Sequence, residues 1–349
     1  MDITFHAPER GATVSLYTDA QRVFRSEEER RANLDGALTF TWYALENTGR
    51  ERSCPAPVRF SFTDNSEDAR DEGYLLLVSR EADMRDPVFA IAVGGKAEIY
   101  NLMAGETYYF CVQKDGVRSA VSYFHTAPDL PRCVRIDGIS NARDLGGYEV
   151  TGGRIRQGLL YRGSEFERHC HPTEEGMRDI RALGLRTDLD LRGEAKDTVL
   201  YPTSRLLGME YILLPTVPYA ALFDKKHRKS TRRFFTLLTH RRAYPIYFHC
   251  WGGADRTGSL AFLLGAFLGM KREDLIYEYE FTSLSCWGTR SRNYPPFMEF
   301  ITALEAFPGD TYAEKADFFL GDVLGLSEKQ RTTIKDIFIE RNEKADYEA

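Results

Sequence analysis

Residues 244–270 read YPIYFHCWGGADRTGSLAFLLGAFLGM, and this stretch determines the fold of the chain around it. The apolar run that ends at Cys250 is typical of a short buried strand, and the run that starts near Thr257 predicts a buried helix. Between them lies the glycine-containing loop WGGADR. A strand, a tight loop and a helix N-terminus in this order direct backbone N–H groups and the positive end of the helix dipole at one point. The sequence therefore predicts an anion-binding loop, and phosphate is the expected anion.

Cys250 and Arg256 stand at the two ends of this loop. Thiols at helix N-termini beside cationic groups have a pKa lowered to about 3.5–7.5, so Cys250 is a candidate nucleophile. Arg256 can offer two parallel N–H donors to phosphoryl oxygens, a geometry that lysine cannot copy. Gly252 and Gly253 allow the backbone to turn tightly, and Thr257 can donate its hydroxyl to the sulfur. A lone cysteine after an apolar strand is ordinarily a small buried hydrophobe, but the arginine and the glycines favour catalysis here.

Strand-like and helical segments alternate on both sides of the loop. The strand-like segments lie at 159–165, 186–193, 210–216 and 245–250, and helical patterns lie at 173–185 and 231–239. This alternation predicts an α/β domain with a mainly parallel central sheet flanked by helices. The residues after 257 read as almost entirely helical, and Ser327 with Gln330 forms a capping-box pattern at the start of the last helix.

The first third of the chain has a different pattern, with apolar residues at every second position. This period is found in 37–45, 58–62 and 107–112, with polar turn signals between the runs, and it predicts an all-β sandwich. The stretch YNLMAGETYYFCV resembles the tyrosine-corner strand of fibronectin type III domains, while a sandwich of another family is the alternative. Two prolines near residue 130 mark the linker. We therefore expect a β-sandwich over 1–128 and an α/β domain over 129–349.

Composition excludes several classes of protein. The 349 residues carry a formal net charge of −6, so no basic field favours nucleic acid as a partner. The six cysteines form no CxxC or CxxH pair, which predicts neither a zinc site nor a disulfide framework, and no metal or other cofactor is expected. The N-terminus lacks the pattern of a secretory signal, and the apolar run 260–270 is shorter than the ~20 residues of a membrane span. These observations favour a cytoplasmic protein.

Two motifs resemble one enzyme family. The loop HCWGGADRTG matches the H-C-x5-R-[ST]-G signature of cysteine-dependent protein tyrosine phosphatases, and SNARDLGGY resembles the N-x-R-D-L-G-G segment of their bacterial branch. The similarity covers roughly residues 132–340 and says nothing of the β-rich region before them. It implies that Cys250 is the nucleophile and Arg256 the phosphate clamp. It also implies a phosphate-binding loop that consists of Trp251, Gly252, Gly253, Ala254, Asp255, Arg256 and Thr257.

The resemblance also suggests which residues assist the reaction. Departure of an alkoxide or phenoxide needs a general acid, and the chain has no Trp-Pro-Asp sequence to supply one. In the bacterial branch the aspartate before the loop arginine serves this role, which implies Asp255. Asp224 is the alternative if the polar stretch 223–229 folds over the site as a lid. Arg143 and Asp144 of the second motif are expected either to contact substrate or to form a structural ion pair or turn.

The loop departs from the family pattern at Ala254, where relatives usually carry lysine. A less basic loop favours phosphotyrosine in proteins, with tyrosine or dual specificity, or another small phosphomonoester. Phosphoinositides or inositol phosphates remain the alternative. Trp251 is expected to form an apolar wall for an aromatic ring or to anchor the loop. A different class of function is a phospho-ligand-binding adaptor whose β-sandwich docks a protein or glycan. A rhodanese-like sulfurtransferase also uses a cysteine in an anion-binding loop, but the Asp-Arg-Thr-Gly ending argues against it.

Overall fold

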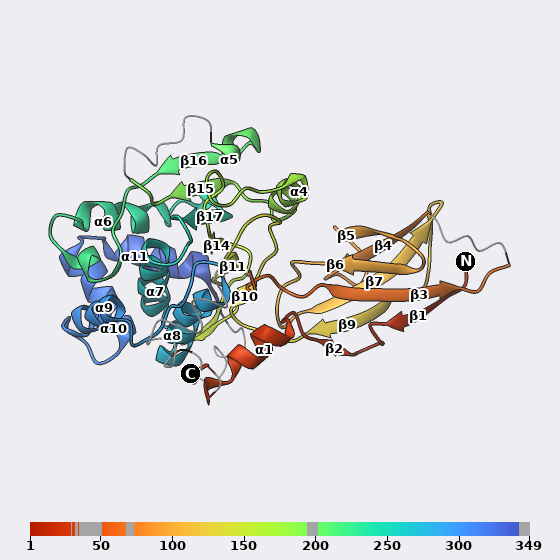
Figure 1. Cartoon of the computed structure of the whole chain (residues 1–349), viewed down its shortest axis with the longest axis horizontal. Coiled ribbons are helices and arrows are strands. Elements are labelled where there is room, and N and C mark those ends of the chain that lie inside the picture. The colour runs from red at the N-terminus through yellow and green to blue at the C-terminus, as the bar shows by residue number, and fades with distance from the viewer. Residues whose placement is uncertain (29, 32–33, 35–50, 68–72, 194–201, 342–349) are drawn as a thin grey trace. The chain divides into compact units, whose positions relative to one another are not determined.

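The computed structural model describes residues 1–28, 30–31, 34, 51–67, 73–193 and 202–341 (Figure 1). The chain divides into two compact units. The first unit comprises Met1–Thr18 with Pro55–Arg132, and the second comprises Asp19–Cys54 with Cys133–Ala349. The observed division after Arg132 lies close to the predicted linker. The described residues of the segment 19–54, however, belong to the second unit and not to the β-sandwich in which the sequence placed them.

Contacts within the second unit explain this correction. The Arg30 guanidinium lies 2.9 Å from Glu280 Oε2, and both side chains are almost fully buried. The Ser53 hydroxyl accepts a hydrogen bond of 3.1 Å from the backbone N–H of Asn141. A buried charge is stable only when it is paired, so Arg30 ties its helical segment to the unit that holds its partner. These long-range contacts leave no periodic signal in the sequence.

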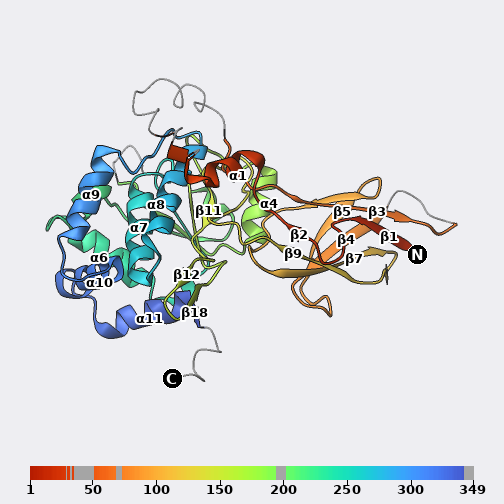
Figure 2. The ribbon, with the colours of Figure 1, turned by 90° about the horizontal axis from the view of Figure 1, so that it is seen from below.

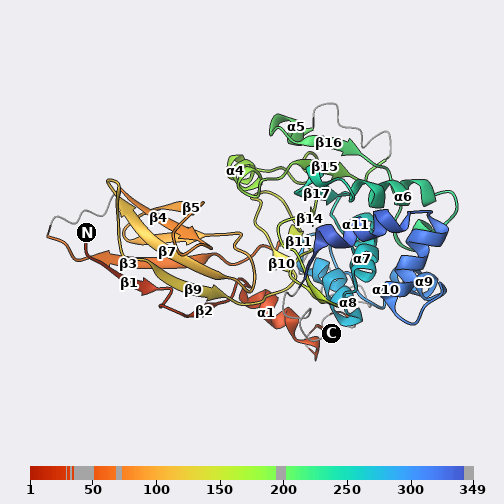
Figure 3. The same cartoon turned by 180° about the vertical axis from the view of Figure 1, so that it is seen from behind.

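The first unit is built from two β-sheets with the orders β1-β3-β6 and β2-β9-β7-β4-β5, and β8 pairs with β7. Neighbouring strands in Figure 3, such as β4, β7 and β9, are antiparallel. The strand bounds are β1 Ile3–Ala7, β2 Thr13–Val14, β3 Val58–Asp64, β4 Tyr74–Ser79, β5 Val88–Ala92, β6 Lys96–Ile99, β7 Thr107–Lys114, β8 Val117–Arg118 and β9 Ser122–Thr126.

Aromatic side chains from both sheets form the core of the first unit. Phe60 of β3 packs edge-to-face on Phe110 of β7 and on Phe124 of β9, with ring centroids 5.2 and 5.7 Å apart. The expected strands at 58–62 and 107–112 are therefore confirmed, with their apolar faces buried. The expected strand at 37–45 lies outside the described residues. The Tyr108 hydroxyl accepts a hydrogen bond of 2.8 Å from the Met103 N–H, a contact of the tyrosine-corner type.

The second unit contains a six-stranded sheet with the order β10-β11-β14-β17-β15-β16. Strands β14, β17, β15 and β16 run parallel, and β11 is antiparallel to β14, so the predicted α/β fold with a mainly parallel sheet is confirmed. A smaller sheet has the order β12-β13-β18. The strand bounds are β10 Arg132–Cys133, β11 Arg143–Asp144, β12 Glu149–Val150, β13 Gly153–Ile155, β14 Leu160–Gly163, β15 Thr187–Asp190, β16 Glu210–Leu213, β17 Ile246–His249 and β18 Ile339–Arg341.

Helices make up most of the rest of the second unit. Their bounds are α1 Asp19–Arg25, α4 Glu174–Ala182, α5 Thr203–Leu206, η2 Tyr219–Phe223, α6 Arg228–Leu237, η3 Arg241–Ala243, α7 Arg256–Leu268, α8 Arg272–Glu280, η4 Phe281–Leu284, α9 Pro295–Glu305, α10 Tyr312–Phe318, η5 Phe319–Val323 and α11 Glu328–Phe338. The predicted capping box of Ser327 and Gln330 is present at the start of α11. Among the described residues, no helix is both long and apolar enough to cross a membrane.

The register of the parallel strands places the loop after β17 at one edge of the sheet. His249, the last residue of β17, is paired with Gly163 of β14 and Asp190 of β15, which end their own strands. The next residue is Cys250, and α7 begins at Arg256. Helix α7 is buried from Thr257 to Leu268 and lies beside α8 (Figure 2), as expected for a helix that is apolar on all sides. The sheet edge and a rigid helix thus hold both ends of the loop.

Candidate active site

The loop from Cys250 to Arg256 has the predicted strand–loop–helix geometry, and both of its glycines are required by their surroundings. A Cβ atom on Gly252 would lie 2.3 Å from the Trp287 ring. Gly253 has φ +65°, and its Cβ would lie 2.2 Å from the carbonyl oxygen of Gly163. The left-handed backbone and the two close approaches exclude a side chain at these positions. The loop therefore packs tightly between β14 and the Trp287 indole.

Two buried side chains hold the loop from its inner side. Asn141 donates a hydrogen bond of 2.8 Å to the carbonyl oxygen of Gly252, and Arg162 donates one to the carbonyl oxygen of Gly253. Arg162 is also paired with Glu278 at 2.7 Å. Because these hydrogen bonds fix the carbonyl groups of Gly252 and Gly253 toward the protein interior, the N–H groups of the loop can bind an anion in the cavity.

Arg143 and Asp144 belong to this support and not to the substrate site. Both side chains are fully buried. Arg143 is paired with Glu278 at 2.7 Å, while Asp144 accepts hydrogen bonds from the N–H groups of Gly146 and Gly158 at 2.8 and 2.5 Å. Buried charges need partners, and the partners of both side chains lie inside the protein. The structural alternative, an ion pair and a turn, is the one observed.

A charged histidine lies beneath the nucleophile. His249 Nδ1–H donates a hydrogen bond of 2.9 Å to the Cys250 carbonyl oxygen, and Nε2 lies 2.9 Å from Asp188 Oδ1. Burial lowers the pKa of His249, but Asp188 and Asp190 outweigh burial and raise this pKa to about 10. An imidazolium is therefore fixed directly under Cys250, whose side chain is itself buried, with the residue only 4% exposed.

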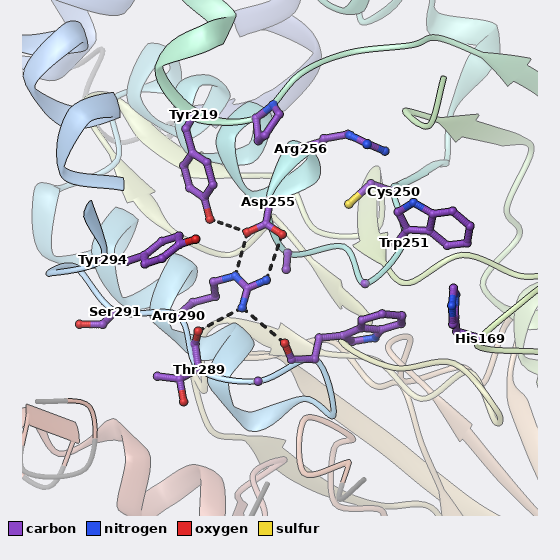
Figure 4. A pocket seen from close by; sticks show the side chains of 15 residues that line it. His169, Tyr219, Cys250, Trp251, Asp255, Arg256, Thr289, Arg290, Ser291 and Tyr294 are labelled. Carbon is purple, nitrogen blue, oxygen red and sulfur yellow. Dashed lines mark hydrogen bonds and ion pairs between the residues drawn. The ribbon is translucent and has the colours of Figure 1, made fainter. Parts of the chain in front are cut away.

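Cys250 opens into a cavity of about 840 Å³ whose walls include two tryptophan and two tyrosine rings (Figure 4). Figure 4 shows Cys250, Trp251 and Arg256 on one side of this cavity, and Asp255 with Arg290 on the other. The lining residues are His169, Pro218, Tyr219, Cys250, Trp251, Gly252, Ala254, Asp255, Arg256, Trp287, Gly288, Thr289, Arg290, Ser291 and Tyr294. The predicted loop residues from Cys250 to Arg256 thus face the cavity, except Gly253, which packs against β14.

Two polar groups at the start of α7 have no protein partner among the described residues. Arg256 Nη1 and the Thr257 hydroxyl are buried and make no hydrogen bond there. Buried donors normally find an acceptor, so such groups beside a helix N-terminus are suited to an anion or a thiolate. This arrangement is compatible with both predicted roles, a phosphate clamp for Arg256 and a hydroxyl donor to sulfur for Thr257.

Asp255 is held as a carboxylate by two side chains. Arg290 Nε and Nη2 donate to its two oxygens at 2.9 Å each, and the Tyr219 hydroxyl donates to Oδ1. Burial raises the pKa of Asp255, but Arg290, the Tyr219 hydrogen bond and Arg256 together bring this pKa below its usual value. Asp224, the alternative acid, is exposed at the end of η2 and does not line the cavity.

The Trp251 ring lines the cavity and also anchors the loop to neighbouring side chains. Its ring lies 4.7 Å from the His169 ring, and the guanidinium groups of Arg168 and Arg192 lie over it at 5.4 and 5.2 Å. His169 also contacts the Trp287 ring at 5.5 Å. These rings form one aromatic side of the cavity.

The sequence did not identify the lining residues that come from other segments. Tyr219 precedes the polar stretch in which Asp224 was considered, and Trp287, Arg290 and Tyr294 come from the loop SCWGTRSRNY before α9. An aromatic and arginine-containing loop just before a Pro-Pro helix start is a weak signal. Nothing in the sequence places it opposite Cys250.

Known proteins with similar sequences are phosphatases, in agreement with the phosphate-binding loop at Cys250. The sequence pattern of the tyrosine phosphatase family matches residues 134–340, which is more than half of the chain. A curated relative from Cupriavidus necator, which bears the name "Putative tyrosine-protein phosphatase H16_A0669", is 28% identical over 172 residues. That alignment covers 41% of this chain and spans 60% of the length of the relative.

Solved structures with partial similarity include two phosphatase-type folds. The catalytic core of the PP-IP phosphatase SIW14 from S. cerevisiae is 17% identical, with a TM-score of 0.31 over 48% of this chain and 89% of that one. A DUF442 protein from Shewanella putrefaciens is 15% identical, with a TM-score of 0.30 over 46% of this chain and 93% of that one. The sequence match over 134–340, together with the loop at Cys250, shows that the chain belongs to the tyrosine phosphatase family.

Proposed function

We propose that this protein is a cysteine-dependent phosphatase that hydrolyses phosphotyrosine in proteins through a phosphocysteine intermediate. One observation carries the proposal: Cys250, Arg256 and Asp255 all face a single cavity with aromatic walls. Family membership supports phosphatase chemistry, and the choice of phosphotyrosine rests on the cavity itself.

Aromatic walls and few free cations favour a single aromatic phosphate. The rings of Trp251, Trp287, Tyr219 and Tyr294 can pack against a phenyl ring. Among the lining residues the arginines are Arg256 and Arg290, and Arg290 is already paired with Asp255. An inositol with several phosphates would need several unpaired cations, which the described residues that line this cavity do not provide.

The first chemical step transfers the phosphoryl group to sulfur. The Cys250 thiolate attacks phosphorus, the P–O bond to the tyrosyl oxygen breaks, and Asp255 in its protonated form gives its proton to that oxygen. Arg256 and the loop N–H groups bind the three non-bridging oxygens as charge develops on them. The products of this step are the phosphocysteine and a tyrosine hydroxyl.

The second step regenerates the Cys250 thiolate. Water attacks the phosphorus of the phosphocysteine, Asp255 accepts a proton from this water, and the S–P bond breaks to release phosphate. Cys250 leaves as a thiolate, and the Thr257 hydroxyl is suited to donate a hydrogen bond to it.

A substrate panel tests the choice of phosphotyrosine. We expect a phosphotyrosyl peptide to be hydrolysed with a higher kcat/KM than a phosphoseryl peptide or an inositol polyphosphate, in the presence of a chelator. Vanadate, an analogue of the transition state, is expected to inhibit all three reactions. A preference for the inositol polyphosphate would overturn the proposed specificity. Activity that is lost in chelator and insensitive to vanadate would overturn the cysteine mechanism.

A substitution of Asp255 tests the proton transfer. In Asp255→Asn we expect the rate to fall much more for phenyl phosphate, whose leaving group has a pKa near 10, than for a dinitrophenyl phosphate, which leaves almost unaided. The measurement is kcat for each substrate in the wild type and the variant. An equal loss for both leaving groups would show that Asp255 only maintains the loop.

The role of the first unit and the cellular location of the protein remain predictions. The contact between Tyr108 and Met103 supports a fibronectin type III-like sandwich, and docking of a protein or glycan is the role we expect for such a module. The cytoplasmic location also stays a prediction.

A further inference from the structure

The Asp255 carboxylate is bound by Arg290 and Tyr219, two residues that lie outside the sequence motif of the loop. Asp255 precedes α7 and occupies the N-cap position, yet its side chain makes no hydrogen bond to the N–H groups of that helix. An aspartate at this position ordinarily accepts a hydrogen bond from the second or third helical N–H. Here the carboxylate is turned away from the helix and toward Arg290 and Tyr219.

Hydrogen bonds fix both the guanidinium group and the backbone of Arg290. Its Nη1 lies 3.0 Å from the carbonyl oxygen of Thr289 and 3.4 Å from that of Trp287, while Nε and Nη2 both bind Asp255. Its backbone is tied to the Ser283 hydroxyl, which accepts from the Arg290 N–H and donates to the Arg290 carbonyl, each at 2.8 Å. The guanidinium is therefore presented to Asp255 in a single orientation.

Tyr219 of η2 also contacts the Asp255 carboxylate, and the backbone of Tyr219 is strained. Its φ is +56°, which is rare for an aromatic residue, and strain of this kind concentrates at functional sites. Its N–H donates 2.8 Å to the Ser259 hydroxyl, and that hydroxyl donates 2.7 Å to the backbone carbonyl of Asp255. Its own hydroxyl donates to Asp255 Oδ1 and lies 3.1 Å from the Tyr279 hydroxyl.

From this geometry, and resting on the proposed function, we propose that Arg290 and Tyr219 are positioning residues for the reaction. They keep the Asp255 carboxylate off the N-terminus of α7, so that the helix N–H groups remain open to phosphate. They also set the pH range in which Asp255 carries the proton that the leaving group needs.

The groups around the carboxylate define the direction of the pH effect. Arg290 faces Asp255 from the loop before α9, Tyr219 from η2 with Tyr279 of α8 behind it, and Arg256 from α7. Each cation and hydroxyl donor stabilises the ionised carboxylate, so removing one makes the carboxyl group retain its proton to higher pH. A general acid works only while protonated, so its rate falls as pH rises through its titration.

The decisive experiment compares kcat against pH for Arg290→Gln, Tyr219→Phe and the wild type, with phenyl phosphate as substrate. We expect the descending limb to move to higher pH in both variants, and further in Arg290→Gln because it loses a full charge. The kcat profile reports the substrate complex, in which phosphate occupies the helix N–H groups and the carboxylate cannot bind them. With a dinitrophenyl phosphate, which needs no proton, this limb is expected to be absent from all three profiles. The matched control is Arg292→Gln, which removes the same charge from the same loop but from a residue paired with Glu280.

Inhibition by inorganic phosphate tests the second half of the proposal. We expect the inhibition constant to rise severalfold in Tyr219→Phe as well as in Arg290→Gln, because the released carboxylate then competes for the helix N–H groups. Tyr219→Phe changes no charge, so a rise in that variant reports the position of the carboxylate and not the field of a lost cation.

Unchanged descending limbs and unchanged phosphate inhibition in folded variants would overturn the proposal. Circular dichroism checks folding, and Tyr219→Phe alone decides the matter if Arg290→Gln does not fold. Failure of the proposed function would look different, because the wild-type activity would then not depend on Cys250 at all.

Discussion

Replacing Cys250 by serine is expected to reduce kcat by roughly 10⁶-fold, the scale seen when a catalytic nucleophile is removed. A serine hydroxyl ionises far less readily than a thiol, and His249 cannot take up its proton, because both ring nitrogens are engaged, one with the Cys250 carbonyl oxygen and the other with Asp188. The helix N-terminus and Arg256 are unchanged in this variant. We therefore expect Cys250→Ser to bind a phosphotyrosyl peptide with an affinity close to the KM of the wild type.

Cys286→Ser is the matched control for this substitution. Cys286 is a half-buried thiol whose Sγ donates 3.3 Å to the Ser140 hydroxyl, and it does not line the cavity. Its replacement should leave kcat within a few-fold of the wild type, since hydroxyl and thiol make the same contact. Steady-state kinetics and calorimetric titration with the peptide check both variants. Turnover near the wild-type rate in Cys250→Ser would place the nucleophile elsewhere.

Arg256→Lys is expected to lower kcat by about 10²–10³-fold, the cost of losing one aligned donor to a transition-state oxyanion. Lysine keeps the positive charge but cannot present two parallel N–H groups to the phosphoryl oxygens. Because the phosphoryl group is the same whichever alcohol departs, the loss should be equal for phenyl and dinitrophenyl phosphates. This uniform loss contrasts with the selective loss expected for Asp255→Asn.

The control for Arg256→Lys is the same change at Arg233, an exposed residue of α6. It should have no measurable effect on kcat or KM. If Arg256→Lys affected only the substrate with the poorer leaving group, Arg256 would act on proton transfer and not on the phosphoryl group.

The sequence predicts the anion-binding loop well because this part of the site is contiguous. A strand that ends at His249 and a helix that starts at Arg256 leave the six residues between them little freedom, and the glycines reveal where the backbone must turn. Each of these features depends on neighbours in the chain. The alternating strands and helices of the second unit are local patterns of the same kind.

The remainder of the site depends on contacts between residues far apart in the chain. Arg290 lies 35 positions from Asp255 and Tyr219 lies 36, and no periodicity links these residues. The two alternatives for Arg143 stayed open in the sequence for the same reason, because its partner Glu278 is 135 positions away. A charged residue in a sequence motif suggests a ligand-binding group, because the sequence does not show the buried residue with which its charge is paired.

The most direct test of the central claim is to trap the covalent intermediate. The wild-type enzyme is mixed with an excess of a phosphotyrosyl peptide, quenched in acid within the first turnover, digested, and analysed by mass spectrometry. We predict phosphate on Cys250, in the peptide that contains HCWGGADR, with a yield that rises in Asp255→Asn if hydrolysis of the intermediate slows more than its formation. Phosphate on any other side chain, or the absence of a phosphoenzyme during turnover at every quench time in both proteins, would contradict the cysteine mechanism.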